Sequence, residues 1–261
     1  MHTVAVKLVT YIDAADKASV RREVRMLRSC DHPNVVRYHD AFEREHMKQT
    51  VLWVVMELCT GGSIEDVMRR LDAPLDEASV AYVCAECLSG LVYLHSKHII
   101  HRDMKAANIL VTSDAQVKLA DLGVAAQLKS TMSQRGTVCG TPTHMAPEAI
   151  MPSFATVAGY DNRVDIWSLG ITAIELAERE VPTHGAQNAI ELAMHVINQP
   201  APTLTWSTAA SPPFRHFIAM SLIKEPQFRP AADELSAHEF VQDTRSVPLA
   251  ELITRGCART Q

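Results

Sequence analysis

Long apolar runs, an excess of basic residues and a paired-cysteine framework are all missing from this 261-residue sequence. No apolar stretch approaches the ~18 residues that a membrane-spanning helix needs, so we expect no membrane span. The net charge of −5 and the pI of about 6.2 provide no overall basic field for nucleic acid, which we do not expect as a partner.

Six cysteines in a chain of this size do not suggest a disulfide framework. We therefore expect a protein of the reducing cytoplasm, with the nucleus as an alternative. The one C-x-x-C pattern, CAEC at 84–87, lies inside a predicted helix and has no second cysteine pair at metal-ligand spacing. We interpret Cys84 and Cys87 as small packing residues.

The sequence does contain a clear change of pattern, from strand-like to helical. Three apolar runs predict strands, at 4–9, 35–42 and 50–58. A helix is predicted within 15–30, a helix start at Ser63 with Asp66 three residues later, and a long helix at about 77–96. From about 162 onward the pattern is helical. This order predicts an α+β protein of two lobes with a cleft between them.

Polar side chains gather between these two parts, in HRDMKAANIL (101–110) and VKLADLGVAAQL (117–128). They include Asp103, Lys105, Asn108 and Asp121. Phosphoryl transfer needs this set of groups: a carboxylate that orients a hydroxyl nucleophile, oxygen ligands that hold magnesium, and a lysine that neutralises the moving phosphoryl group. Asp121 and Asn108 have the oxygen atoms that Mg²⁺ prefers.

HRDMKAAN resembles the protein kinase catalytic loop H-R-D-x-K-x-x-N. VAVK (4–7), DLG (121–123) and MAPE (145–148) resemble the kinase motifs V-A-I-K, D-F-G and A-P-E, and they stand in the same order. HRDMKAANIL, KLADLGVAAQL, GTPTHMAPEAI and DIWSLGITAIELAE are similar to the Sterile-20-like serine/threonine kinases, in particular the germinal-centre and Hippo type. The resemblance covers nearly the whole chain.

The resemblance implies a partial kinase N-lobe over 1–58, a C-lobe over 59–245 and an extension helix over 246–261. It also implies a serine/threonine kinase that transfers the γ-phosphate of ATP, with Mg²⁺, to a protein substrate in signalling. The implied catalytic residues are Asp103 as base, Lys105 at the γ-phosphate, Asn108 and Thr141. The implied nucleotide and metal residues are Lys7 paired with Glu23, Asp121 and Asn108 at Mg²⁺, and Ala5, Met56, Glu57, Cys59 and Leu110 around adenine.

Further roles implied by the resemblance concern regulation. Thr137 would be the activating phosphorylation site, modified by an upstream kinase or by the chain itself, with Arg102 as the partner of the phosphate. Thr131 and Ser133 are the alternative sites in the same segment. Leu27, Tyr38, His101 and Leu122 would form a regulatory spine held by Asp165. Glu148 and Arg229 would form a buried ion pair that anchors the activation segment.

The chain departs from the family in two places. Only six residues precede Lys7 and none is glycine, so this sequence does not contain the Gly-rich loop that covers the phosphates in kinases. We interpret this as a truncated gene model, with a natural short form as the alternative. Thr143 and His144 stand where the family usually has two aromatic residues, which predicts a different substrate-docking segment.

Two other functions stay open from the sequence. A pseudokinase or allosteric scaffold would explain the absent Gly-rich loop. A small-molecule phosphotransferase would share the chemistry of the aspartate and asparagine residues. GTPTHMAPE opposes the second alternative, because in the family that segment forms a platform for a peptide.

Overall fold

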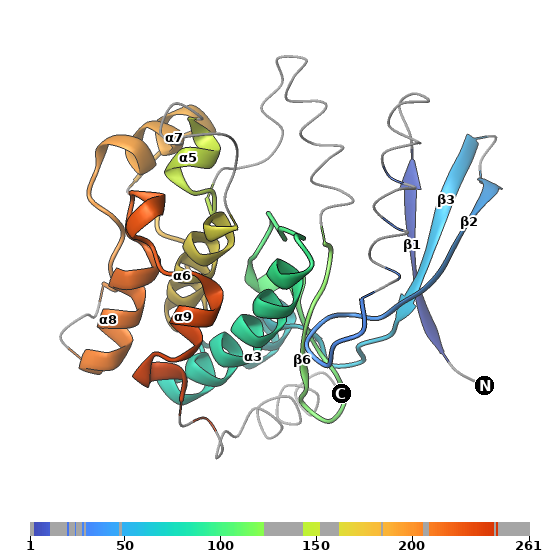
Figure 1. Cartoon of the computed structure of the whole chain (residues 1–261), viewed down its shortest axis with the longest axis horizontal. Helices are drawn as coiled ribbons and strands as arrows, with labels where there is room; N and C mark the ends of the chain where they lie inside the picture. Colours follow the sequence, from blue (N-terminus) through green and yellow to red (C-terminus); the bar gives the residue numbers. More distant parts are fainter. Residues whose placement is uncertain are drawn as a thin grey trace.

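A computed structural model of the chain describes residues 3–10, 20, 24, 28, 30–46, 49–122, 143–151, 162–183, 185–205, 209–242 and 244. Figure 1 shows a small three-stranded sheet on one side of the molecule and a larger helical body on the other. The structure therefore confirms the predicted α+β fold of two lobes. The extension helix predicted over 246–261 lies outside the described residues.

The smaller lobe is an antiparallel sheet in the order β1-β3-β2. Its strands are β1 (Val4–Thr10), β2 (Tyr38–His46) and β3 (Gln49–Glu57). Exposure alternates along β1: Val4, Val6 and Leu8 are exposed, whereas Ala5 and Lys7 are half-buried. Because side chains of a strand alternate between its two faces, Ala5 and Lys7 share one face.

The predicted helix within 15–30 is described at four positions: Val20, Val24 and Arg28 are helical, whereas Cys30 is not. Val20 and Val24 are buried in the same core as β3, whereas Arg28 is exposed. The strand predicted at 35–42 begins only at Tyr38. Val35 and Val36 are buried against the larger lobe instead, where the Val36 amide donates to the Leu119 carbonyl over 2.9 Å.

The larger lobe begins with a second small sheet and two helices. The sheet has the order β4-β5-β6, made of β4 (Gly62–Ser63), β5 (Ile109–Val111) and β6 (Val117–Leu119). Helix α2 (Ile64–Leu71) starts at the predicted cap, since the Ser63 hydroxyl accepts from the Asp66 amide and the Asp66 carboxylate accepts from the Ser63 amide. Helix α3 (Glu77–Ser96) has the predicted bounds.

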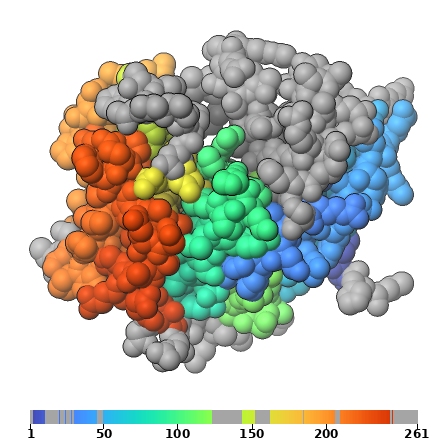
Figure 2. Space-filling model, in the orientation of Figure 1, coloured from blue at the N-terminus to red at the C-terminus, as the bar shows by residue number. Residues whose placement is uncertain are grey.

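Helix α3 is the one described helix that is long and apolar enough to cross a membrane. More than half of its apolar window is buried inside the protein, and it packs against α6, α9 and β6. Figure 2 shows α3 in green, between the red helices near the C-terminus and the blue segment that follows residue 30. Cys84 and Cys87 are free, buried thiols on this helix, and burial raises the pKa of both.

The rest of the larger lobe surrounds α6 (Arg163–Glu178), in which thirteen residues are buried. The other described elements are η1 (Ala106–Asn108), α5 (Pro147–Ile150), α7 (Ala189–Asn198), α8 (Pro212–Ser221), η3 (Pro226–Phe228), α9 (Ala232–Ser236) and η4 (Glu239–Val241). Helix α6 is buried on all sides, and one of its residues holds the loop of the candidate site in place.

Candidate active site

Asp165, in the first turn of α6, holds the loop that carries the polar motif. Its side chain is fully buried, and its two oxygens accept from the amides of His101 and Arg102, each over 2.8 Å. The His95 Nε2 atom lies 2.8 Å from the same carboxylate and donates to it, because a carboxylate only accepts. Three donors make this buried charge tolerable and fix the backbone of the loop, in which Arg102 has a φ of 66°.

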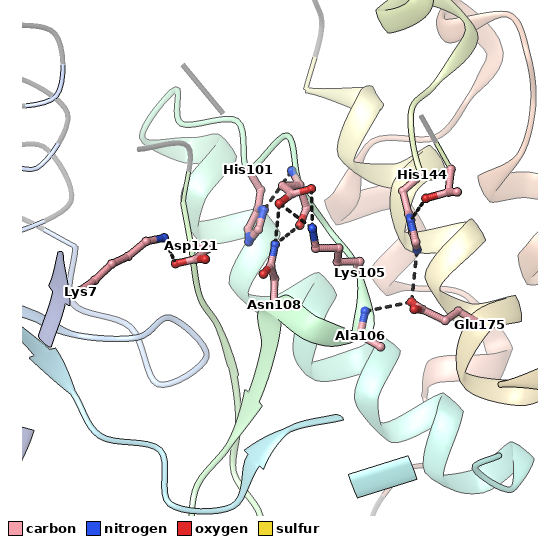
Figure 3. Close-up of polar contacts among 10 residues, drawn as sticks. Lys7, His101, Lys105, Ala106, Asn108, Asp121, His144 and Glu175 are labelled. Carbon is pink, nitrogen blue, oxygen red and sulfur yellow. Dashed lines mark hydrogen bonds and ion pairs between the residues drawn. The ribbon is translucent and has the colours of Figure 1, made fainter. Parts of the chain in front are cut away.

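The loop brings Asp103, Lys105 and Asn108 together (Figure 3). The Lys105 Nζ atom lies 3.2 and 3.0 Å from the two carboxylate oxygens of Asp103. The Asn108 amide nitrogen donates to the Asp103 backbone carbonyl over 2.7 Å and to its carboxylate over 2.9 Å. Asp103 is therefore oriented from two sides and placed where it can accept a proton from a hydroxyl group.

Asn108 also connects this loop to the next motif. Its backbone carbonyl accepts from the Ala120 amide over 2.9 Å, and Asp121 follows directly. Both side-chain hydrogen bonds of Asn108 use its nitrogen, so its amide oxygen remains the atom that can bind a cation.

Lys7 and Asp121 meet across the two lobes. The Lys7 Nζ atom lies 2.5 Å from the Asp121 Oδ1 atom, and the two side chains are 31% and 38% exposed. Asp121 has a φ of 60°, an uncommon backbone conformation for a residue other than glycine. Glu23, the partner predicted for Lys7, lies outside the described residues.

The residues predicted around adenine come from β1, β3 and β5, except Cys59, which follows the end of β3. Ala5 pairs with Met56 in the sheet, and Leu110 is half-buried in β5. Met56 and Cys59 are buried, and burial with the neighbouring Glu57 carboxylate raises the pKa of Cys59 to about 11. Cys59 is therefore a protonated thiol at neutral pH and contributes no nucleophile.

The predicted spine residues Tyr38, His101 and Leu122 are all buried, and Leu27 lies outside the described residues. Burial lowers the pKa of His101, so its ring is neutral at neutral pH. The predicted pair of Glu148 and Arg229 is present as a bidentate contact of 2.6 and 3.2 Å between side chains that are 2% and 0% exposed. Thr137 and Thr141 lie outside the described residues.

Two charged residues, Lys118 and Glu175, make polar contacts at the site that were not predicted from the sequence. Lys118, buried in β6, donates to the Pro33 carbonyl over 2.9 Å and lies 3.2 Å from the Glu57 carboxylate. Glu175 of α6 accepts from the Ala106 amide over 2.9 Å and contacts His144. A charged residue within an otherwise apolar stretch is the signal that could have pointed to each of them.

The side-chain oxygens of Asp121 and Asn108 suit a hard divalent cation that also binds phosphate oxygens. Within the described ranges, no group of three or more His, Cys, Asp or Glu side chains could hold a metal ion alone. Mg²⁺ does not need such a cage, because it is commonly bound by one or two protein oxygens with waters and substrate phosphates completing its shell. Asp121 and Asn108 can supply those protein oxygens.

Comparison with known proteins gives a consistent result over most of the chain. Residues 1–241 match the protein kinase domain family. The chain is 43% identical over 240 residues to serine/threonine-protein kinase 1 of Arabidopsis thaliana, covering 92% of this chain and 28% of that protein. It is 41% identical over 257 residues to serine/threonine-protein kinase hippo of Drosophila melanogaster, covering 98% and 36%.

A third relative is mitogen-activated protein kinase kinase kinase kinase 3 of Homo sapiens, which is 41% identical over 248 residues, covering 94% of this chain and 27% of that protein. The chain thus spans about a third of the length of these curated relatives.

Proposed function

This chain belongs to the protein kinase family, in its Sterile-20-like serine/threonine branch, and we propose that it transfers the γ-phosphoryl group of ATP to serine or threonine side chains of other proteins. The observation that carries this proposal is the contact set of Asp103, Lys105 and Asn108 on a loop anchored to α6. Protein substrates and ATP use follow from the family, whereas the roles of individual residues are our proposal.

Asp103 accepts the proton of the substrate hydroxyl group as the hydroxyl oxygen attacks the γ-phosphorus, and the bond from this phosphorus to the β,γ-bridging oxygen breaks so that ADP leaves. Its negative charge is stabilised by Lys105 and by the Asn108 amide, which also orient the carboxylate. Lys105 lies close enough to turn toward the γ-phosphate, where its ammonium group offsets the charge that spreads over the transferring oxygens. Lys7 binds the α- and β-phosphates and, to do so, exchanges its contact with Asp121 for the nucleotide.

Asp121 and the amide oxygen of Asn108 would hold Mg²⁺. The bound ion would supply positive charge that offsets part of the charge of the phosphates. The 2.9 Å bond between the Asn108 carbonyl and the Ala120 amide keeps the two ligand residues at a fixed separation along the backbone. In the Lys7–Asp121 contact, an ammonium group lies against the Asp121 carboxylate. A bound metal ion would likewise place positive charge against this carboxylate.

Adenine would lie between Ala5 and Leu110, beside Met56, with the backbone of Glu57 and Cys59 as its hydrogen-bonding edge. The Glu57 side chain is already engaged, because it accepts from the Arg37 amide over 3.2 Å and pairs with Lys118. These two contacts hold the Glu57 side chain in place.

We further propose that phosphorylation of Thr137, by an upstream kinase or by the chain itself, raises activity. Arg102 supports this regulation: its side chain is exposed while its backbone amide is fixed by Asp165, so a guanidinium group stands beside Asp103 for a phosphate to bind. A cytoplasmic location, with the nucleus as an alternative, remains a proposal from composition.

Neither the relatives nor the described site favours the pseudokinase alternative, since the relatives are named as kinases and the described polar residues of the site are retained. The test compares the chain with its Asp103→Asn variant on a panel of serine and threonine peptides with ATP and Mg²⁺. We expect turnover to fall by ~10²–10⁴-fold, the range for a lost general base. Equal turnover of the two proteins would reject the assignment.

A further inference from the structure

We propose that His144 and Glu175 form a positioning pair that fixes the substrate-docking segment against the catalytic loop and so sets how a peptide is presented to Asp103. The inference deepens the proposed function and rests on it. The evidence is a chain of contacts that joins residue 144, in the segment before α5, to residue 106, which begins η1 (Figure 3).

One oxygen of Glu175 makes both links. Its Oε2 atom accepts from the Ala106 amide over 2.9 Å and lies 3.2 Å from the His144 Nε2 atom. Ala106 is fully buried, and it directly follows Lys105. A displacement of the Glu175 carboxylate therefore acts on the backbone of the catalytic loop and on the docking segment together.

The pair is shielded from water, because the side chains of His144 and Glu175 are only 11% and 13% exposed. Hydrogen bonds to charged groups are stronger in such surroundings than at the surface. His144 is also held at two other points. Its carbonyl accepts from the Ser168 hydroxyl over 2.7 Å, and its Nδ1 atom lies 2.9 Å from the Thr143 hydroxyl.

The protons of this network can be assigned from its geometry. A carboxylate only accepts, so the His144 Nε2 atom carries a proton and donates it to Glu175. The Thr143 hydroxyl can donate to the Nδ1 atom when the ring is neutral or accept from it when the ring is charged. The link to Glu175 is therefore kept in both charge states of His144, as a permanent positioning device requires.

The hydrogen bond from the Ala106 amide to Glu175 acts on the η1 turn, which carries Asn108. The η1 turn runs from Ala106 to Asn108 and has no side-chain cap from Lys105, the residue at its cap position. Glu175 satisfies the first amide of this turn instead, and the turn ends at Asn108, which orients Asp103. On the other side, Met145 follows His144 and is 41% exposed.

The experiment compares His144→Leu, which removes the donor, with His144→Gln, whose amide nitrogen can still reach Glu175. His39→Leu, at an exposed histidine of β2, is the control. For His144→Leu we expect the KM for peptide to rise by about tenfold or more, the scale of a lost hydrogen bond to a charged group, with the KM for ATP unchanged. His144→Gln should recover most of the loss, and His39→Leu should match the parent protein.

A double-mutant cycle with Glu175→Ala tests whether the two residues act as a unit. The loss in the His144→Leu/Glu175→Ala double variant should be smaller than the product of the two single losses. Melting temperatures identify any variant that fails to fold, and in that case the cycle is repeated with His144→Ala, which also removes the donor, in place of His144→Leu.

The inference is overturned if peptide KM is unchanged in His144→Leu, if His144→Gln and His144→Leu lose activity equally, or if the losses in the cycle multiply fully. In each of these cases a retained loss in Asp103→Asn keeps the proposed kinase function. Activity that does not depend on Asp103 would instead reject the function itself.

Discussion

The two lobes hold their parts of the candidate site in different ways. On the larger lobe, the catalytic loop rests on the buried Asp165, and the buried pair of Glu148 and Arg229 fixes the segment that precedes α6. On the smaller lobe, Lys7 lies on a half-buried strand, and its described partner is Asp121. The comparison shows buried anchors on the larger lobe and a partly exposed ion pair on the smaller lobe, whose lysine would exchange Asp121 for a nucleotide under the proposed function.

The largest effect on stability is expected at Glu148. Glu148→Ala leaves the fully buried Arg229 guanidinium without its carboxylate, although three backbone carbonyls still accept from it. Removal of one partner of a buried ion pair costs about 3–5 kcal/mol, and urea unfolding of the variant measures that loss.

The matched control is Asp72→Ala. Asp72 and Arg179 form a pair with the same 2.6 Å separation, but their side chains are 84% and 37% exposed. We expect that variant to lose at most about 1 kcal/mol. Similar losses at the two pairs would contradict the view that burial distinguishes them.

The next effect is expected for Asp165→Asn. The amide keeps the size of the side chain, but its nitrogen cannot accept, so one of the amides of His101 and Arg102 loses its acceptor. The cost of one buried unsatisfied donor is about 1–3 kcal/mol. Turnover should fall as well, because the loop that orients Asp103 is displaced, and kinetics on the folded variant below its melting temperature measure that fall.

A smaller effect is expected from pH at His101. Its pKa is lowered by burial, so the folded state disfavours the charged ring, whereas the unfolded chain takes up the proton near pH 6.5. The neutral ring therefore contributes stability above about pH 6.5, and this contribution is lost as the pH falls from there toward the lower pKa of the folded state.

The measurement is the free energy of unfolding at pH 7.5 and at pH 5.5 for the parent protein, His101→Gln and the exposed control His39→Gln. His101→Gln should flatten the pH dependence, and His39→Gln should leave it as in the parent protein. An unchanged slope in His101→Gln would show that other groups govern stability in this range.

The smallest effect on stability is expected for Lys7→Met, although its effect on nucleotide binding is large. The Lys7–Asp121 pair is about one-third exposed on both sides, so its loss should change the free energy of unfolding by no more than about 1 kcal/mol. The melting shift caused by ATP and Mg²⁺ should shrink in the variant, because the lysine no longer binds the phosphates. A loss of stability as large as that of Glu148→Ala would contradict the view that the two lobes hold their parts of the site differently.

Short-range sequence patterns predicted the elements whose formation depends on residues close together in the sequence. Helix α3 has the predicted bounds, and the cap at Ser63 forms as its spacing required, because both depend on residues only a few positions apart. The start of β2 was predicted too early, because Val35 and Val36 are apolar for packing against the larger lobe rather than for pairing in the sheet.

The sequence by itself determined the family, the α+β fold and the residue types of the site, because the motifs are short, ordered and chemically specific. Only the tertiary structure decided which groups meet. Lys7 and Asp121 are 114 positions apart, and Glu175 lies 69 positions from Ala106 and 31 from His144. Such contacts depend on how β1 faces the larger lobe and how α6 is buried beneath the catalytic loop. Periodicity and spacing describe only neighbours within a few residues, so they could not specify these pairs.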